Sequence, residues 1–111
     1  MMLRDYEVVP YRRLLCAVVL KAVEDYQDVL RQDGIQAAEA SRVGRWFLAP
    51  VVEFGNFRHL CELLGREPDR LLSRLNTRDL LKEMRALQAG LDAQYMRYRA
   101  MVDGGLSMPA E

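Results

Sequence analysis

Six polar side chains with the chemistry to bind nucleic acid recur at helical spacing in the middle of the chain: Arg66, Arg70, Ser73, Arg74, Thr77 and Arg78. Residues four apart share one face of a helix. Guanidinium groups pair with phosphates or fork onto guanine, and hydroxyls add hydrogen bonds. The spacing therefore predicts a DNA-binding face, in which Arg66 and Arg78 contact phosphates and the other four side chains face the groove.

Residues 57–75 follow the plan of a helix-turn-helix corner. In that plan a small apolar residue packs the first helix on the second, and a glycine four positions later makes the turn. An aliphatic residue six positions further on anchors the second helix. Cys61, Gly65 and Leu71 occupy these three positions, so they would support the arginine face.

The corner also departs from the plan of a DNA-binding protein. Arg66 and Arg74 stand where apolar residues are usual, and Glu67 and Asp69 would repel a phosphate at the start of the second helix. Two other interpretations therefore stay open. One is a plain helical corner with a solvated arginine face, and the other is a face that pairs with an acidic partner protein.

Four aromatic residues flank a short loop at residues 51–55: Trp46, Phe47, Phe54 and Phe57. Filling of the core is the favoured interpretation, and the apolar side chains of the loop are expected to pack inward. The alternative is a partner-binding patch that includes Phe54 and keeps Trp46 partly exposed.

No pattern in the sequence indicates catalysis. His59 and Cys61 are two residues apart, so a helix turns them to different faces, and the chain has no second histidine. There is no phosphate loop, nucleotide fingerprint or Ser/His/Asp set. We expect no catalytic residue, no cofactor and no metal site. The acidic residues Glu24, Asp25 and Asp28 are interpreted as a solvated helix face.

The composition limits the class of protein. The 111 residues carry 16 basic and 16 acidic side chains, so a strongly basic nucleic-acid-coating arm is excluded. Two cysteines exclude a disulfide scaffold and a zinc module of usual spacing. The apolar run at residues 14–20 is too short to span a bilayer and has no cleavage site after it. We therefore expect no membrane contact and a location in the cytoplasm of a bacterial host cell.

Hydrophobic periodicity predicts an all-α bundle of about five helices, with the helix-turn-helix-like corner and a long C-terminal helix. Pro10 suits the first position of the first helix, and Asp33-Gly34 ends it. Asn56 and Gly65 cap the third helix. Gly104-Gly105 is expected to end the last helix, so that residues 1–103 form a single domain with a flexible tail at 104–111. The expected helices cover residues 11–32, 36–48, 57–64, 68–75 and 77–102.

The last expected helix has a near-heptad apolar seam at residues 80, 84, 87, 91, 95, 98 and 102. Either this helix folds back along the first helix, or its outer half pairs with a second copy of the chain. A homodimer through residues 80–102 is the preferred arrangement.

Residues 11–75 resemble small, uncharacterised helical proteins encoded in bacteriophage and prophage regions. The residues that carry the resemblance are Arg13-Leu14, Trp46-Phe47, Phe57, Leu60-Cys61, Leu64-Gly65 and Pro68-Asp69. The resemblance implies a phage origin and brings no catalytic residue to this chain. Together with the corner, it leads us to expect a small phage-type regulatory protein that binds DNA. The alternative is a protein-interaction module that modulates a host or phage protein without contacting DNA.

Overall fold

The computed structural model describes the backbone of residues 5–107 and the side chains of residues 10–102. The described backbone is all-α, as the sequence predicts, with six helices rather than about five and no strand. The helices are α1 (Asp5–Asp33), α2 (Ile35–Ala40), α3 (Arg42–Leu48), α4 (Phe57–Leu64), α5 (Pro68–Leu72) and α6 (Arg78–Ser107).

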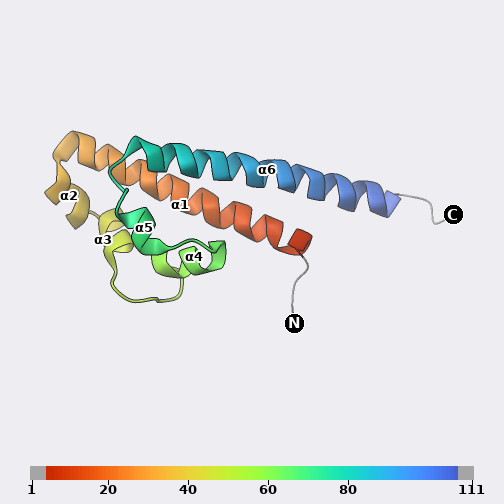
Figure 1. Cartoon of the computed structure of the whole chain (residues 1–111), viewed down its shortest axis with the longest axis horizontal. Helices are drawn as coiled ribbons and strands as arrows, with labels where there is room; N and C mark the ends of the chain where they lie inside the picture. Colours follow the sequence, from red (N-terminus) through yellow and green to blue (C-terminus); the bar gives the residue numbers. More distant parts are fainter. Residues whose placement is uncertain (1–4, 108–111) are drawn as a thin grey trace.

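The two long helices, α1 and α6, lie side by side and run in opposite directions (Figure 1). The four short helices lie along one side of α1, with α2 at the end where α1 finishes and α4 beside its middle. The core lies between these two groups, because each helix contributes one apolar face to it. Its buried side chains include Cys16, Val19, Val23, Phe47, Phe57, Cys61, Leu71, Leu80 and Met84.

The first half of the α6 seam is covered by α1. Leu80, Met84 and Leu91 are buried, and the Sγ atom of Cys16 lies 3.9 Å from the carbonyl oxygen of Met84. The last helix therefore folds back along the first. This part of the seam is not available for the predicted dimer through residues 80–102.

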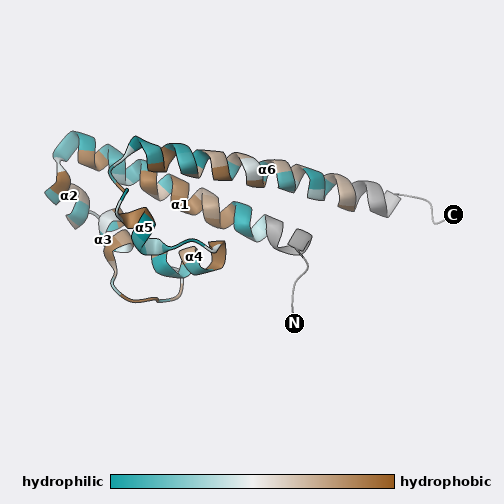
Figure 2. Cartoon of the chain, viewed as in Figure 1, coloured by the Kyte–Doolittle hydropathy of each residue, from teal (hydrophilic) through white to brown (hydrophobic). Residues whose placement is uncertain are grey.

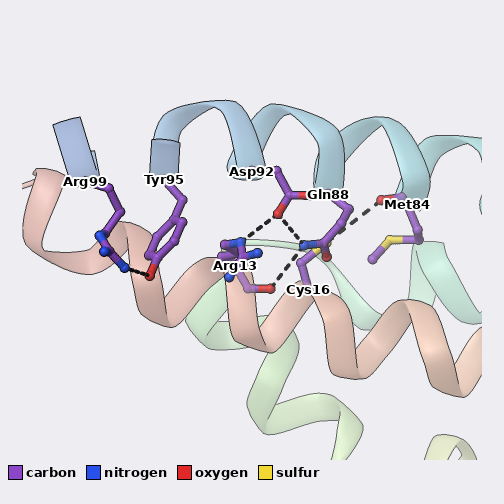
Figure 3. Close-up of polar contacts among 7 residues, drawn as sticks. All are labelled: Arg13, Cys16, Met84, Gln88, Asp92, Tyr95 and Arg99. Atoms are coloured by element: carbon purple, nitrogen blue, oxygen red, sulfur yellow. Dashed lines mark hydrogen bonds and ion pairs between the residues drawn. The ribbon is translucent and has the colours of Figure 1, made fainter. Parts of the chain in front are cut away.

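Polar side chains connect the two long helices beyond the apolar core (Figure 3). Arg13 Nε donates to Asp92 Oδ1 at 2.7 Å, and its guanidinium carbon lies 4.4 Å from the centre of the Tyr95 ring. Gln88 Nε2 also donates to Asp92 Oδ1, at 3.1 Å. These contacts fix the register of α1 against α6.

The start of α1 differs from the prediction, because the helix begins at Asp5 and Pro10 lies inside it. A proline lacks the N–H that would bond to the carbonyl four residues before it. Only one bond is lost in this way, in the second turn of a helix of 29 residues. The proline is therefore accommodated.

The single helix expected at residues 36–48 is divided into α2 and α3 at Ser41. The Ser41 backbone is extended, and its hydroxyl oxygen accepts from the backbone nitrogen of Gly44 at 3.0 Å. A Cβ atom on Gly44 would lie 2.0 Å from the carbonyl oxygen of Ala38. Gly44 therefore allows the close approach of the two short helices.

The corner forms where the sequence predicts it. Asn56 caps α4, and Gly65 closes the helix in the left-handed conformation, with φ of 70°. The second helix of the corner ends at Leu72, earlier than predicted, and turns follow until Thr77 caps α6. The corner and the long helix are therefore separate elements.

The end of α6 also differs, because the helix continues through Gly104 and Gly105 to Ser107. Each glycine weakens a helix by roughly 1 kcal/mol relative to alanine and does not by itself stop it. Residues 108–111, the rest of the expected tail, lie outside the described residues.

Candidate functional site

The apolar contacts that define the corner are all present. Cys61 is fully buried between the helices, and Leu71 and Leu75 anchor the second helix and the turn after it. Arg12 of α1 donates from Nη2 to the carbonyl oxygen of Leu64 at 3.3 Å, so a positive charge lies at the C-terminal end of α4. The corner is therefore fixed on α1.

Three of the predicted DNA-binding arginines point into solvent. Arg66, Arg70 and Arg78 are exposed, and their side chains make no hydrogen bond or ion pair with the side chains that the structure describes. Asp69, expected to repel a phosphate, accepts from Arg58 Nη2 at 2.9 Å, which offsets its charge. These three guanidinium groups are free to bind an anion.

The other three predicted residues have structural roles. Arg74 is half-buried and pairs with Glu83 of α6 at 2.8 Å. The Ser73 hydroxyl donates to the carbonyl of Arg70 at 2.8 Å. The Thr77 hydroxyl donates to the carbonyl of Arg74 at 2.7 Å and accepts from the backbone nitrogen of Leu80 at 3.2 Å. These groups hold the turn between α5 and α6.

A cavity of about 500 Å³ lies on the corner between α5 and α6. It brings Arg66, Arg70 and Arg74 together with two acids, and it does not include Ser73, Thr77 or Arg78. Its lining residues are Gly65, Arg66, Glu67, Arg70, Leu71, Arg74 and Glu83. Because this lining contains both arginines and acidic residues, it is less favourable to a phosphate than the predicted DNA-binding face, which contains arginines and hydroxyl groups alone.

The aromatic cluster splits into a buried part and an exposed part. Phe47 and Phe57 are buried, with ring centres 4.9 Å apart, and the half-buried Trp46 ring packs edge-on against both. Phe54 is 97% exposed, and the centre of its ring lies 5.4 Å from that of the His59 ring. The predicted inward packing of the loop is therefore wrong for this residue.

Three further apolar side chains, all within six residues of Phe54 in the sequence, are half-exposed: Leu48, Val51 and Val52. We call these four residues the loop patch. Figure 2 shows the hydrophobic colour of the segment between α3 and α4. The predicted inward packing is also wrong for Val51 and Val52, because their exposure depends on how the loop leaves α3.

The base of the loop is held by hydrogen bonds. Trp46 Nε1 donates to the carbonyl of Gly55 at 3.1 Å, and the backbone nitrogen of Gly55 donates to His59 Nδ1 at 2.9 Å. Asn56 Nδ2 donates to the carbonyl of Val51 at 2.7 Å. With φ of 82°, Gly55 has the left-handed backbone that this turn requires. The loop patch is therefore presented by a fixed backbone.

Both cysteines are unsuited to nucleophilic chemistry. Burial raises the pKa of the Cys16 thiol to about 11 and that of Cys61 to about 12. A thiol, rather than the reactive thiolate, is then the state at neutral pH. Among the described residues, no cluster of His, Cys, Asp or Glu could hold a metal ion.

Two further findings concern membrane-spanning helices and similarity to known proteins. None of the described helices combines the length and apolarity that crossing a membrane requires. Comparison of the chain with protein-family models, with curated proteins and with solved structures finds no match. The functional interpretation therefore rests on two surfaces, the loop patch and the exposed arginine residues of the corner, Arg66, Arg70 and Arg78.

Proposed function

We propose that the chain is a protein-interaction module that binds a partner protein through the loop patch. The observation that carries the proposal is the near-complete exposure of Phe54, together with three half-exposed apolar residues in the same short segment of the chain. Clustered apolar residues on a surface favour a protein interface, and aromatic anchors supply much of the binding free energy there. The sequence leaves this function open as the alternative to DNA binding, and the exposed aromatic side chain of Phe54 supports it.

The hydrogen bonds at the base of the loop support the proposal. Association loses less conformational entropy when the binding residues are already fixed before the partner arrives. Trp46, Asn56 and His59 hold the loop backbone in place through their side chains. The loop patch is thus ready to bind without refolding. A host or phage protein as partner, and a regulatory role in a bacterial cytoplasm, rest on the resemblance of residues 11–75 alone.

The test replaces Phe54 with the photoreactive analogue p-benzoylphenylalanine in cells that produce the protein. We expect irradiation to give one main adduct with a different protein, and the purified partner to bind the wild-type chain. Phe54→Asp should weaken that binding at least tenfold. Glu53→Gln, an exposed polar change in the same loop, is the matched control and should leave it unchanged. Absence of an adduct, or equal binding by Phe54→Asp, would contradict the proposal.

A second candidate function is contact with the phosphates of duplex DNA through Arg66, Arg70 and Arg78. The observation in its favour is that these three guanidinium groups are exposed and have no acidic partner among the described side chains. Because Ser73, Arg74 and Thr77 are engaged locally, this contact would involve the DNA backbone rather than the base edges.

Fluorescence anisotropy with a labelled duplex at several salt concentrations tests this candidate. Three phosphate contacts predict a slope of about −2.7 in the log–log plot of affinity against salt. The triple variant Arg66→Glu, Arg70→Glu, Arg78→Glu should not bind, whereas Arg45→Glu, an exposed change on α3, should bind nearly as well as the wild type. Failure of the folded wild-type protein to bind at low salt would rule out the candidate.

A further inference from the structure

One face of α1 carries exposed apolar residues that no other helix covers. Tyr11 is 65% exposed, Leu14 is 62% exposed and Val18 is 44% exposed. At about 100° per residue, Leu14 and Val18 lie roughly 160° and 200° around the helix from Cys16, which faces α6. This outer face therefore points away from α6. Its apolar residues are spaced three and four positions apart, so they form a continuous stripe along α1.

The outer face continues into a groove between α1 and α3. The groove has a volume of about 560 Å³. Its lining is mainly apolar and consists of Val18, Lys21, Ala22, Asp25, Ser41, Arg42, Val43 and Trp46. Large side chains thus stand on the N-terminal side of Val18, and a hollow lies on its C-terminal side.

The positions on the two sides of Val18 match each other. Leu14 lies four residues before Val18 and Ala22 lies four after it, while Tyr11 lies seven before and Asp25 seven after. If two α1 helices cross in opposite directions at Val18, Leu14 of one copy meets Ala22 of the other. A large side chain then fills the space above a small one. The Tyr11 hydroxyl of one copy can donate to the Asp25 carboxylate of the other.

We propose that this face is the interface of a homodimer, with a two-fold axis at Val18. Such an interface uses the same patch on both copies, so the patch must complement itself. The charges beside the outer face agree with this requirement, because Lys21 and Asp25 pair with each other at 3.0 Å within one copy and need no opposite charge from the other. The zero net charge of the chain removes long-range repulsion between copies.

The proposed dimer is independent of the loop patch and of the exposed arginine residues of the corner. It also differs from the dimer expected through residues 80–102, because the first half of the α6 seam is packed against α1. Here the second copy covers the outer apolar face of α1, which the fold of a single chain leaves open.

Sedimentation equilibrium of the full chain over the micromolar to millimolar range tests the interface. We expect a monomer–dimer equilibrium, with the dissociation constant raised at least tenfold by Leu14→Glu. Because Leu14 is exposed, this variant should keep the circular dichroism spectrum and thermal midpoint of the wild type. Leu63→Glu, at an apolar position on α4 that is 51% exposed, is the matched control and should leave the equilibrium unchanged. A wild-type protein that stays monomeric, or a dimer that Leu14→Glu leaves intact, would overturn the proposal.

Disulfide cross-linking tests the position of the axis. A residue on a two-fold axis lies next to its own copy, so Val18→Cys should form a covalent dimer under mild oxidation. Gln36→Cys, an exposed position on α2, should not do so. Cys16 and Cys61 are fully buried and do not compete for the cross-link. Efficient cross-linking by Phe54→Cys with none by Val18→Cys would move the interface to the loop patch and overturn the proposal.

Discussion

Because Gly44 has no side chain, α3 can lie closer to α2 than an alanine at this position would allow. A Cβ atom at this position would lie 2.0 Å from the Ala38 carbonyl oxygen and 2.8 Å from that of Glu39. Both atoms belong to the backbone, so they cannot move aside as a flexible side chain can. We expect Gly44→Ala to lower the free energy of unfolding by about 2–3 kcal/mol, in the range typical of overpacking.

Gly90 provides the matched control for this prediction. It lies in α6, and nothing is within 4 Å of the Cβ that alanine would add. Gly90→Ala should therefore stabilise the protein by about 0.5–1 kcal/mol, through the better helix propensity of alanine. Urea unfolding of both variants provides the measurement. Equal effects of the two substitutions would show that the contact between α2 and α3 is not tight.

The two buried thiols make stability depend on pH above the ordinary thiol pKa of 9.0. In the unfolded chain the thiols lose their protons near that pH, whereas burial raises the folded pKa values to about 11 for Cys16 and about 12 for Cys61. The unfolded state then binds fewer protons, so the free energy of unfolding falls as pH rises through this range.

Urea unfolding at neutral pH and about one unit above 9.0 measures this effect. The double variant Cys16→Ala, Cys61→Ala should lose less stability between the two conditions than the wild type. A loss of the same size in both proteins would assign the pH dependence to other groups.

At the scale of one element, α4 illustrates what local sequence can specify. Asn56, Gly65 and the apolar spacing between them predict both ends of the helix, and the structure confirms both. Capping groups act on backbone atoms within three or four residues, so no knowledge of the rest of the fold is needed.

Asn56 has two separable roles in this element. Its Oδ1 accepts from the backbone nitrogen of His59 at 3.0 Å, and its Nδ2 donates to the carbonyl of Val51 at 2.7 Å. Asn56→Ala removes both and should destabilise the protein by about 1–2 kcal/mol. Asn56→Asp keeps the cap and loses only the donor to Val51.

We therefore expect Asn56→Asp to change the environment of the loop more than the stability of α4. Hydrogen exchange of the Val51–Gly55 amides, compared with those of α4, measures the difference. Equal loss of protection in both segments of the Asp variant would contradict two separate roles.

Other element boundaries could not be predicted, because they depend on contacts distant in sequence. The break at Ser41 interrupts a pattern whose apolar spacing continues on both sides. Pro10 and Gly104 are usual marks of helix ends, yet helix continues through both. Each is a weak local signal, which neighbouring helical turns and packing can override.

For the whole molecule, sequence predicts the class of fold but not which surfaces remain free. The seam of α6 is visible in the sequence, whereas the choice of α1 as its partner is not. The same holds for the candidate site, because Arg74 pairs with Glu83, nine residues away in α6, and is no longer free to bind another group. Phe54 shows the converse, since an aromatic residue expected in the core lies in solvent.

The pairing of α1 with α6 leads to a prediction on pH. Hydrogen bonds from Arg13 and then Gln88 hold the pKa of Asp92 below its ordinary value of 3.8. Stability from this carboxylate is present above 3.8 and is lost as the pH falls through the lowered value. Protonation of Asp92 should free Arg13 from its position over the Tyr95 ring.

The NMR signals of the Tyr95 ring should then shift as the pH is lowered, with a midpoint below 3.8, and Asp92→Asn should abolish that transition. An unchanged midpoint in Asp92→Asn would assign the shift to another group.

The antiparallel pairing of the first and last helices also has a consequence for synthesis on the ribosome. The apolar face of α1 emerges first, but Leu80 and Met84, which cover part of it, are made more than fifty residues after Val23. Until then the nascent chain displays that face to chaperones and to other nascent chains. Completion of the fold therefore waits for α6 to leave the exit tunnel, and a ribosome stalled between Leu75 and Leu80 would hold a chain whose core is still open.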